Sequence, residues 1–228
     1  MSVTPRKTRS QGPAEDIDLD HPNGHDEKSG WLNLENELTF YGSYHSTWGN
    51  KLIHFICIPL IVWSTLVLLS AWSLPNSLTY VIARPLAYQP SLALVFVVTY
   101  QLYYIALDAF LGLTCLPWMS LVYLTATYTY HFPPSWAPFS TAAHPTAVPL
   151  AWIVFTSAWI GQFIGHGVFE RRAPALKDNL VQAIVTAPFF VHLEFMFEVF
   201  GVRPDLAKRV KHRVGARVRA FQRSVKKE

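Results

Sequence analysis

The chain has 228 residues, of which 51% are hydrophobic and only 15% are charged. This balance argues against a water-soluble globular protein and favours a membrane protein. The formal net charge is +4, and the two cysteines, Cys57 and Cys115, lie in apolar runs where packing is expected and no disulfide framework is implied.

Polarity divides the sequence into three parts. Residues 1–30 form a polar extension that is expected to be disordered, and they contain no apolar run typical of a cleaved secretory signal. Residues 31–202 hold the long apolar runs and are the expected membrane-embedded domain. Residues 203–228 form a strongly basic tail.

Four apolar runs predict four transmembrane helices. Residues 52–72 contain no Asp, Glu, Lys or Arg over 21 residues, which matches the ~20 residues that a helix needs to cross hydrocarbon. Residues 91–130 are twice as long, with Asp108 as their only charge, so two crossings joined by a tight turn near Asp108 and Gly112 are expected. Residues 147–169 supply the fourth span.

The connecting segments carry different signals. Residues 73–90 and 131–146 are rich in proline and are predicted to be loops. Residues 179–201 are apolar but contain Glu194 and Glu198, and an acidic group at mid-membrane costs on the order of 2.5–3.5 kcal/mol. This segment is therefore predicted to be a re-entrant or interfacial helical hairpin, with a fifth span as the alternative.

Charge placement predicts the orientation of the spans. With a cytosolic N-terminus, four spans put residues 73–90 and 131–146 on the far side, where Arg84 is the only Lys or Arg. Both termini are then cytosolic. The sequence thus predicts an all-α polytopic membrane protein with four transmembrane helices, the hairpin and a basic amphipathic C-terminal helix.

The tail is predicted to be that amphipathic helix, lying on an anionic membrane surface. Nucleic-acid binding is the competing interpretation of its charge, but the apolar stripe and the attached spans disfavour it. The residues of the stripe recur every three or four positions: Leu206, Val210, Val214, Val218, Phe221 and Val225.

The predicted topology brings five polar residues to the cytosolic side: His45, His54, Asp108, His166 and Glu170. Gln162, His166 and Glu170 are spaced four apart and share one helical face. His45 and His54 are nine residues apart, so both point inward only if the chain bends, for which Gly49 and Asn50 are the expected place.

Three histidines at one membrane depth suggest a divalent transition metal, because imidazole suits iron, zinc and copper. The spacing matches no dense metal-binding motif, and the alternative is that each histidine is an interfacial hydrogen-bonding residue. Asp108 is expected to cap a helical turn. His192 is a doubtful further neighbour of the site, and tyrosines near span ends, such as Tyr41, are expected to anchor the membrane interface.

Two blocks of sequence resemble a known family. They are FYGSYHSTWGNKLIHFICIP at 40–59 and WIGQFIGHGVFERRAPALKDNLVQAIVTAPFF at 159–190. Together they resemble the fungal endoplasmic-reticulum 2-hydroxy fatty acid dioxygenases, including the yeast enzyme of phytosphingosine breakdown. The resemblance implies iron(II)-dependent α-oxidation, in which a long-chain 2-hydroxy fatty acid and O2 give a fatty acid one carbon shorter.

The resemblance also implies a set of site residues within a catalytic domain spanning 31–202. His45, His54 and His166 are the implied ligands of Fe(2+). Glu170, Arg171, Asn50 and Asn179 are implied catalytic residues. Of these, Glu170 is expected to accept a hydrogen bond from a ligating histidine, or to be a ligand itself. Arg171 is expected either to orient the substrate carboxylate or to be only a positive-inside flank.

The implied partners are the 2-hydroxy acid, O2 and membrane lipid, with neither nucleic acid nor a known protein partner. The implied location is the endoplasmic-reticulum membrane. The alternative is a non-enzymatic membrane protein that binds lipid or shapes the bilayer. A transporter is disfavoured, because the polar residues gather at one face rather than along a path through the midplane.

Overall fold

The computed structural model describes residues 32–171 and 180–225, which are mostly helical. The predicted helical class is therefore confirmed. In chain order the elements are α1 (Leu34–Ser43), α2 (Trp48–Leu69), β1 (Tyr80–Ala83), β2 (Leu86–Tyr88), α3 (Leu92–Leu107), α4 (Ala109–His131), α5 (Val148–Ile164), the π-helix η1 (Gly165–Glu170), α6 (Leu180–Phe200) and α7 (Pro204–Val225).

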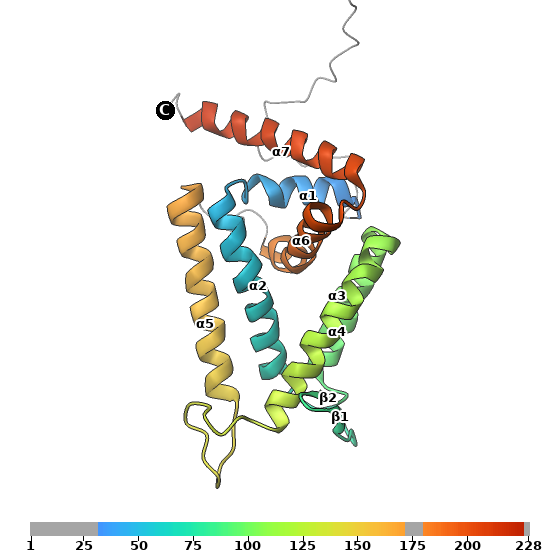
Figure 1. Cartoon of the computed structure of the whole chain (residues 1–228), viewed down its shortest axis with the longest axis vertical. Coiled ribbons are helices and arrows are strands. Elements are labelled where there is room, and N and C mark those ends of the chain that lie inside the picture. The colour runs from blue at the N-terminus through green and yellow to red at the C-terminus, as the bar shows by residue number, and fades with distance from the viewer. Residues whose placement is uncertain (1–31, 172–179, 226–228) are drawn as a thin grey trace, which may run out of the picture.

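Within residues 32–171 and 180–225, three helices are long and apolar enough to cross a membrane: α2, α4 and the continuous stretch Val148–Glu170 formed by α5 and η1. Helices α2 and α5 run side by side, while α3 and α4 form a second pair that leans away from them (Figure 1). Helix α3 is apolar but has only 16 residues, about 24 Å at the usual rise, which is shorter than a ~30 Å hydrocarbon core.

Asp108 forms the turn between α3 and α4, as its sequence context predicts. One carboxylate oxygen accepts a hydrogen bond from the Leu111 N–H at 2.9 Å and so caps α4. The other lies 3.3 Å from Nη2 of Arg203, just before α7. Asp108 therefore ties two turns together at one end of the molecule.

The predicted loop at 73–90 is partly wrong, because it contains a two-stranded antiparallel sheet in which Tyr80 pairs with Tyr88. The strands form because aromatic and β-branched residues flank the turn and give it a packing surface. Ala87 is fully buried, and the Tyr123 hydroxyl of α4 accepts a hydrogen bond from the Gln89 N–H at 3.2 Å. This sheet and residues 132–147 lie at the end of the spans opposite α1 and α7 (Figure 1).

The predicted hairpin at 179–201 is replaced by one continuous helix, α6, which passes through Pro188. Helix α6 lies crosswise to α2 and α5 beneath α1 (Figure 1). The helix is held by the core, where the Phe189 ring stacks on Tyr104 at a centroid distance of 4.4 Å and the Tyr104 hydroxyl donates to the Val185 carbonyl at 2.9 Å. Glu194 is paired with Lys51, so its charge is compensated without a reversal of the chain.

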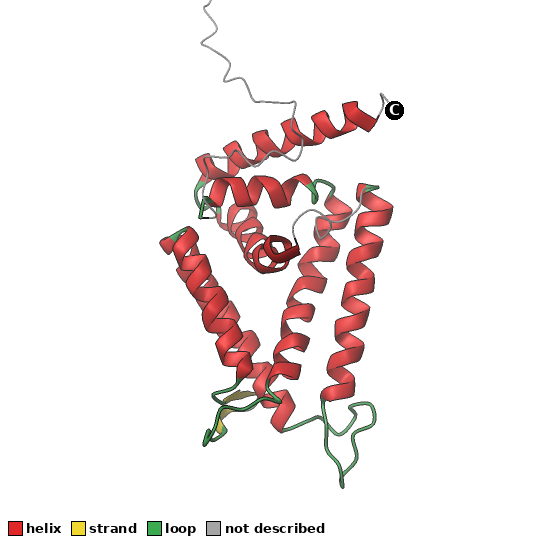
Figure 2. Cartoon of the chain, turned by 180° about the vertical axis from the view of Figure 1, so that it is seen from behind, coloured by secondary structure: helices red, strands yellow, loops and turns green. Residues whose placement is uncertain are grey.

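Helix α7 packs on α1, and α1 lies between α7 and the ends of the spans (Figure 2). Glu35 accepts from Nε of Arg209 at 2.9 Å and from Nη1 of Arg213 at 3.4 Å. Val210 is 8% exposed and packs in the core. The first half of the predicted apolar stripe, Leu206 to Val214, thus packs against protein.

Candidate metal centre

The connection between α1 and α2 carries His45. Helix α1 ends at Ser43 and α2 begins at Trp48, so the chain bends over residues 44–47. The bend expected at Gly49 and Asn50 is wrong, because both residues lie in the first turn of α2. The earlier bend still lets His45 and His54 face one another, since His45 stands outside the helix that carries His54.

Helix α5 approaches α2 closely through two glycines, and this brings His166 to the same place. A Cβ atom on Gly161 would lie 2.9 Å from Cys57 Sγ, and one on Gly165 would collide with Asn50 Oδ1. Small residues four apart allow such contact between membrane helices. His166 follows in η1, and π-helical turns of this kind often occur at functional sites.

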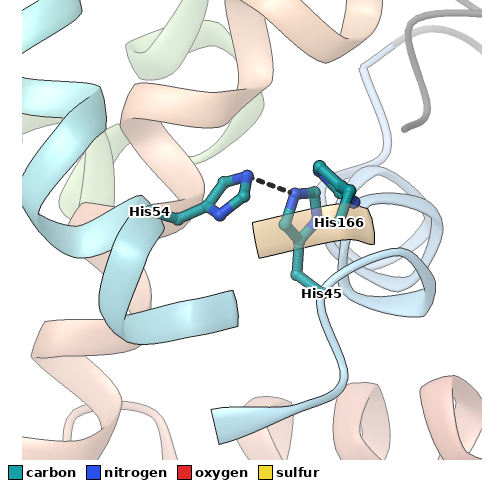
Figure 3. Close-up of side chains that lie close together, drawn as sticks. All are labelled: His45, His54 and His166. Atoms are coloured by element: carbon teal, nitrogen blue, oxygen red, sulfur yellow. Dashed lines mark hydrogen bonds between the residues drawn. The ribbon is translucent and has the colours of Figure 1, made fainter. Parts of the chain in front are cut away.

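The three histidines converge in one buried cluster (Figure 3). His45, His54 and His166 are 3%, 4% and 5% exposed. The ring centroid of His45 lies 4.2 Å from that of His54 and 4.8 Å from that of His166, and the centroids of His54 and His166 are 5.0 Å apart. One nitrogen from each residue lies within 4.8 Å of the others.

Hydrogen bonds determine which nitrogens of the cluster carry protons. His45 Nδ1 lies 2.8 Å from the Tyr41 carbonyl, and His54 Nδ1 lies 2.9 Å from the Asn50 carbonyl. Because a carbonyl oxygen only accepts, both Nδ1 atoms are donors, and in the neutral rings both Nε2 atoms keep a lone pair. These two Nε2 atoms face each other at 2.9 Å, the contact drawn as a dashed line in Figure 3.

Two opposed lone pairs repel, whereas a cation bound by both nitrogens turns the same contact into two ligand bonds. Burial, together with the neighbouring His54 and His166, holds the pKa of His45 well below its usual value, which keeps the ring neutral. His166 Nδ1 is buried and has no hydrogen-bond partner within the described part of the chain. These three residues therefore fit a divalent transition metal, with the two carbonyls orienting the rings.

Glu170 stabilises the backbone between His45 and His54. Its Oε1 accepts from the Thr47 N–H at 2.8 Å, from Thr47 Oγ1 at 2.9 Å and from Asn50 Nδ2 at 3.3 Å, while Oε2 accepts from Ser46 Oγ at 2.9 Å. The expected hydrogen bond from a ligating histidine is not among these contacts. The carboxylate instead caps the N-terminus of α2, where its negative charge complements the helix dipole.

Asn50 connects the hydrogen bonds of Glu170 to the histidines. The residue is fully buried, its main-chain carbonyl meets His54, and its Nδ2 donates to Glu170. Its Oδ1 is buried and has no partner among the described residues. Asn50 thus contacts both Glu170 and His54, and its second amide atom lies where the chain passes close at Gly165.

The other predicted residues are not members of the three-histidine cluster or lie outside the described residues. Arg171 is exposed and ends η1 with a left-handed backbone, φ 51°. Asn179 lies outside the described residues. His192 Nε2 lies 2.9 Å from Thr114 Oγ1 and is not one of the three clustered histidines. Asp108 is occupied by its cap and by Arg203.

Two features of the centre were missed in the sequence. Tyr41, predicted to be an interfacial anchor, is 3% exposed, and its ring stacks on His45 at 4.0 Å. The spacing of four between Tyr41 and His45 was the available signal. Lys51 pairs with Glu194 of α6, and no spacing could reveal a contact between residues so far apart in sequence.

Comparisons with known proteins show to which family the chain belongs. Residues 32–199, which include all three histidines, match the family described as 2-hydroxy-palmitic acid dioxygenase Mpo1-like. The chain is 32% identical over 183 residues to the 2-hydroxy-palmitic acid dioxygenase MPO1 of Saccharomyces cerevisiae, an alignment that covers 80% of this chain and 90% of the yeast protein. No solved structure matches the chain. The family predicted from the two histidine-containing blocks is thus confirmed, and the chain belongs to the Mpo1-like family.

Proposed function

We propose that this protein is an Fe(II)-dependent dioxygenase that converts a long-chain 2-hydroxy fatty acid and O2 to a fatty acid one carbon shorter. The observation that supports it most is the histidine cluster, in which the two unprotonated Nε2 atoms of His45 and His54 lie 2.9 Å apart and one nitrogen of each of the three rings lies within 4.8 Å of the others. The yeast relative is named for 2-hydroxy-palmitic acid and for dioxygenase activity, and the proposal extends both to this chain.

His45, His54 and His166 would hold the iron. Bound iron(II) supplies a Lewis acid and a one-electron centre for the 2-hydroxy acid and O2. Tyr41 and Asn50 hold the rings of His45 and His54 through their carbonyl groups. Glu170 keeps the bend that carries His45 against the start of α2.

The position of the centre suits a lipid substrate. The histidines lie near the ends of α2 and α5 on the side of α1, and these helices expose large apolar side chains along their length. An acyl chain can remain in the lipid while its polar head enters the cluster, where burial of the three rings excludes water. Arg171 and Asn179 are proposed to act on the head group from the segment that follows η1.

We assign the enzyme to the endoplasmic-reticulum membrane, with cytosolic termini, and to the degradation of sphingolipid long-chain bases. The orientation is supported by Arg84, the one basic residue in the two segments at the end opposite α1 and α7. Both α1 and α7 lie at the other end of the spans (Figure 1).

The test uses the full chain, purified in detergent without oxygen and loaded with Fe(II). We expect bound iron and O2-dependent conversion of 2-hydroxypalmitate to the acid one carbon shorter. His45→Ala, His54→Ala and His166→Ala should each lose iron and turnover, whereas His144→Ala, in an exposed loop, should keep both. Absence of iron binding and of turnover in the wild type would favour the non-enzymatic alternative.

A further inference from the structure

An ion pair joins α2 to α6 beside the histidine cluster. Lys51 Nζ donates to Glu194 Oε1, and the side chains are 36% and 17% exposed. Glu194 is therefore removed from water more completely than Lys51. The pair compensates the charge of the more buried Glu194, while the ammonium of Lys51 stays partly in contact with water.

The pair lies against the histidine cluster from two directions. Lys51 precedes His54 by three residues in α2, so the two side chains lie on neighbouring positions of one helical face. Glu194 follows Phe190 by one turn of α6, and the Phe190 ring lies 4.5 Å from Tyr41 and 6.2 Å from His45. The ion pair thus joins a position of α2 about one turn from His54 to a position of α6 about one turn from Phe190.

We propose that Lys51 binds the carboxylate of the substrate, and that Glu194 is an internal carboxylate that occupies Lys51 until the substrate replaces it. The inference rests on the proposed function, since it assigns the head group of that same substrate. Glu194 shows that a carboxylate fits against Lys51 one turn from His54. A carboxylate offers two oxygens with about four acceptor positions, so it can receive the ammonium and still have lone pairs for another partner.

This assignment predicts opposite effects for the two members of the pair. Lys51→Met removes the charge-assisted hydrogen bond to the substrate and should raise the dissociation constant of 2-hydroxypalmitate about tenfold. Glu194→Gln removes the competing charge and should lower the same constant severalfold. If the pair only held α2 to α6, both substitutions would loosen the site and both would weaken binding.

The experiment measures binding as well as turnover. Iron-loaded full chain is titrated with 2-hydroxypalmitate by calorimetry without oxygen, and the iron content, kcat and KM are determined for each variant. Lys51→Arg should retain most of the affinity. Lys208→Met, an exposed lysine of α7, is the matched control and should bind as the wild type does. Hexadecane-1,2-diol, which lacks the carboxylate, should bind the wild type and Lys51→Met equally.

Weaker acid binding in both Lys51→Met and Glu194→Gln would overturn the proposal, as would an equal loss of diol binding in Lys51→Met. If Lys51→Met leaves Glu194 uncompensated and the protein loses iron, the double variant Lys51→Met with Glu194→Met removes both charges. It should fold, hold iron and bind the acid about tenfold more weakly; wild-type affinity would overturn the proposal. Failure of the proposed function would give a different result, because the wild type itself would then neither hold iron nor convert 2-hydroxypalmitate.

Discussion

Gly165 offers a sharp test of how α5 supports the metal centre. In Gly165→Ala the new Cβ would lie closer than 3.0 Å to Asn50 Oδ1, so the buried amide must shift by several tenths of an ångström. Overpacking of this kind costs ~1–3 kcal/mol, against a gain of up to ~1 kcal/mol from replacing glycine in a helix. Because the Asn50 carbonyl orients His54, we expect metal affinity to fall about tenfold.

Gly167→Ala is the matched control. It makes the same change two residues later in η1, where no atom of the described residues outside its own helical turn lies within 4 Å of the added Cβ. It should be neutral or slightly stabilising. Metal affinity is measured by competition with a chelator, and stability by thermal unfolding of the same detergent samples. If both variants behave as the wild type does, the close contact between Gly165 and Asn50 has no role in positioning His54, and the reasoning is refuted.

Two further predictions follow from the same centre. Glu170→Ala removes the acceptor of four hydrogen bonds at the start of α2. We expect the free energy of unfolding to fall by ~2–4 kcal/mol and iron binding to weaken. Denaturant unfolding measures the loss, and a loss under ~0.5 kcal/mol would contradict the prediction. Removing the metal should lower the melting temperature by several degrees, since a ligand at a hundred times its Kd contributes ~2.7 kcal/mol. The chelator should have no such effect on His166→Ala, and an equal shift in that variant would place the metal elsewhere.

Much of the fold was predictable because crossing a membrane depends on properties of contiguous residues. The run at 52–72 corresponds to α2, the run at 147–169 to α5 and η1, and the turn at Asp108 was placed correctly. The structure of segment 179–201 was predicted wrongly, because the prediction assumed that the charge of Glu194 has no partner. Lys51, 143 positions earlier in the sequence, removes that assumption.

The convergence of the three histidines was predictable, but the contacts around them were not. Topology alone brought His45, His54 and His166 to one depth, and the resemblance to a family indicated which metal to expect. Spacing did not indicate that Glu170 would cap α2 in place of supporting a histidine. It also did not indicate that Tyr41 would be buried against His45, because both outcomes depend on how α1 meets the start of α2.

The sequence by itself determined which segments are apolar enough to be candidate membrane spans, where the basic residues lie along the chain and which histidines lie near the span ends. These follow from apolar length and charge, whose energies add along the chain. The tertiary structure alone decided that two unprotonated Nε2 atoms face each other, that Glu170 clamps the bend and that Lys51 meets Glu194. These contacts depend on packing between distant segments, where a shift of one ångström makes or breaks a hydrogen bond.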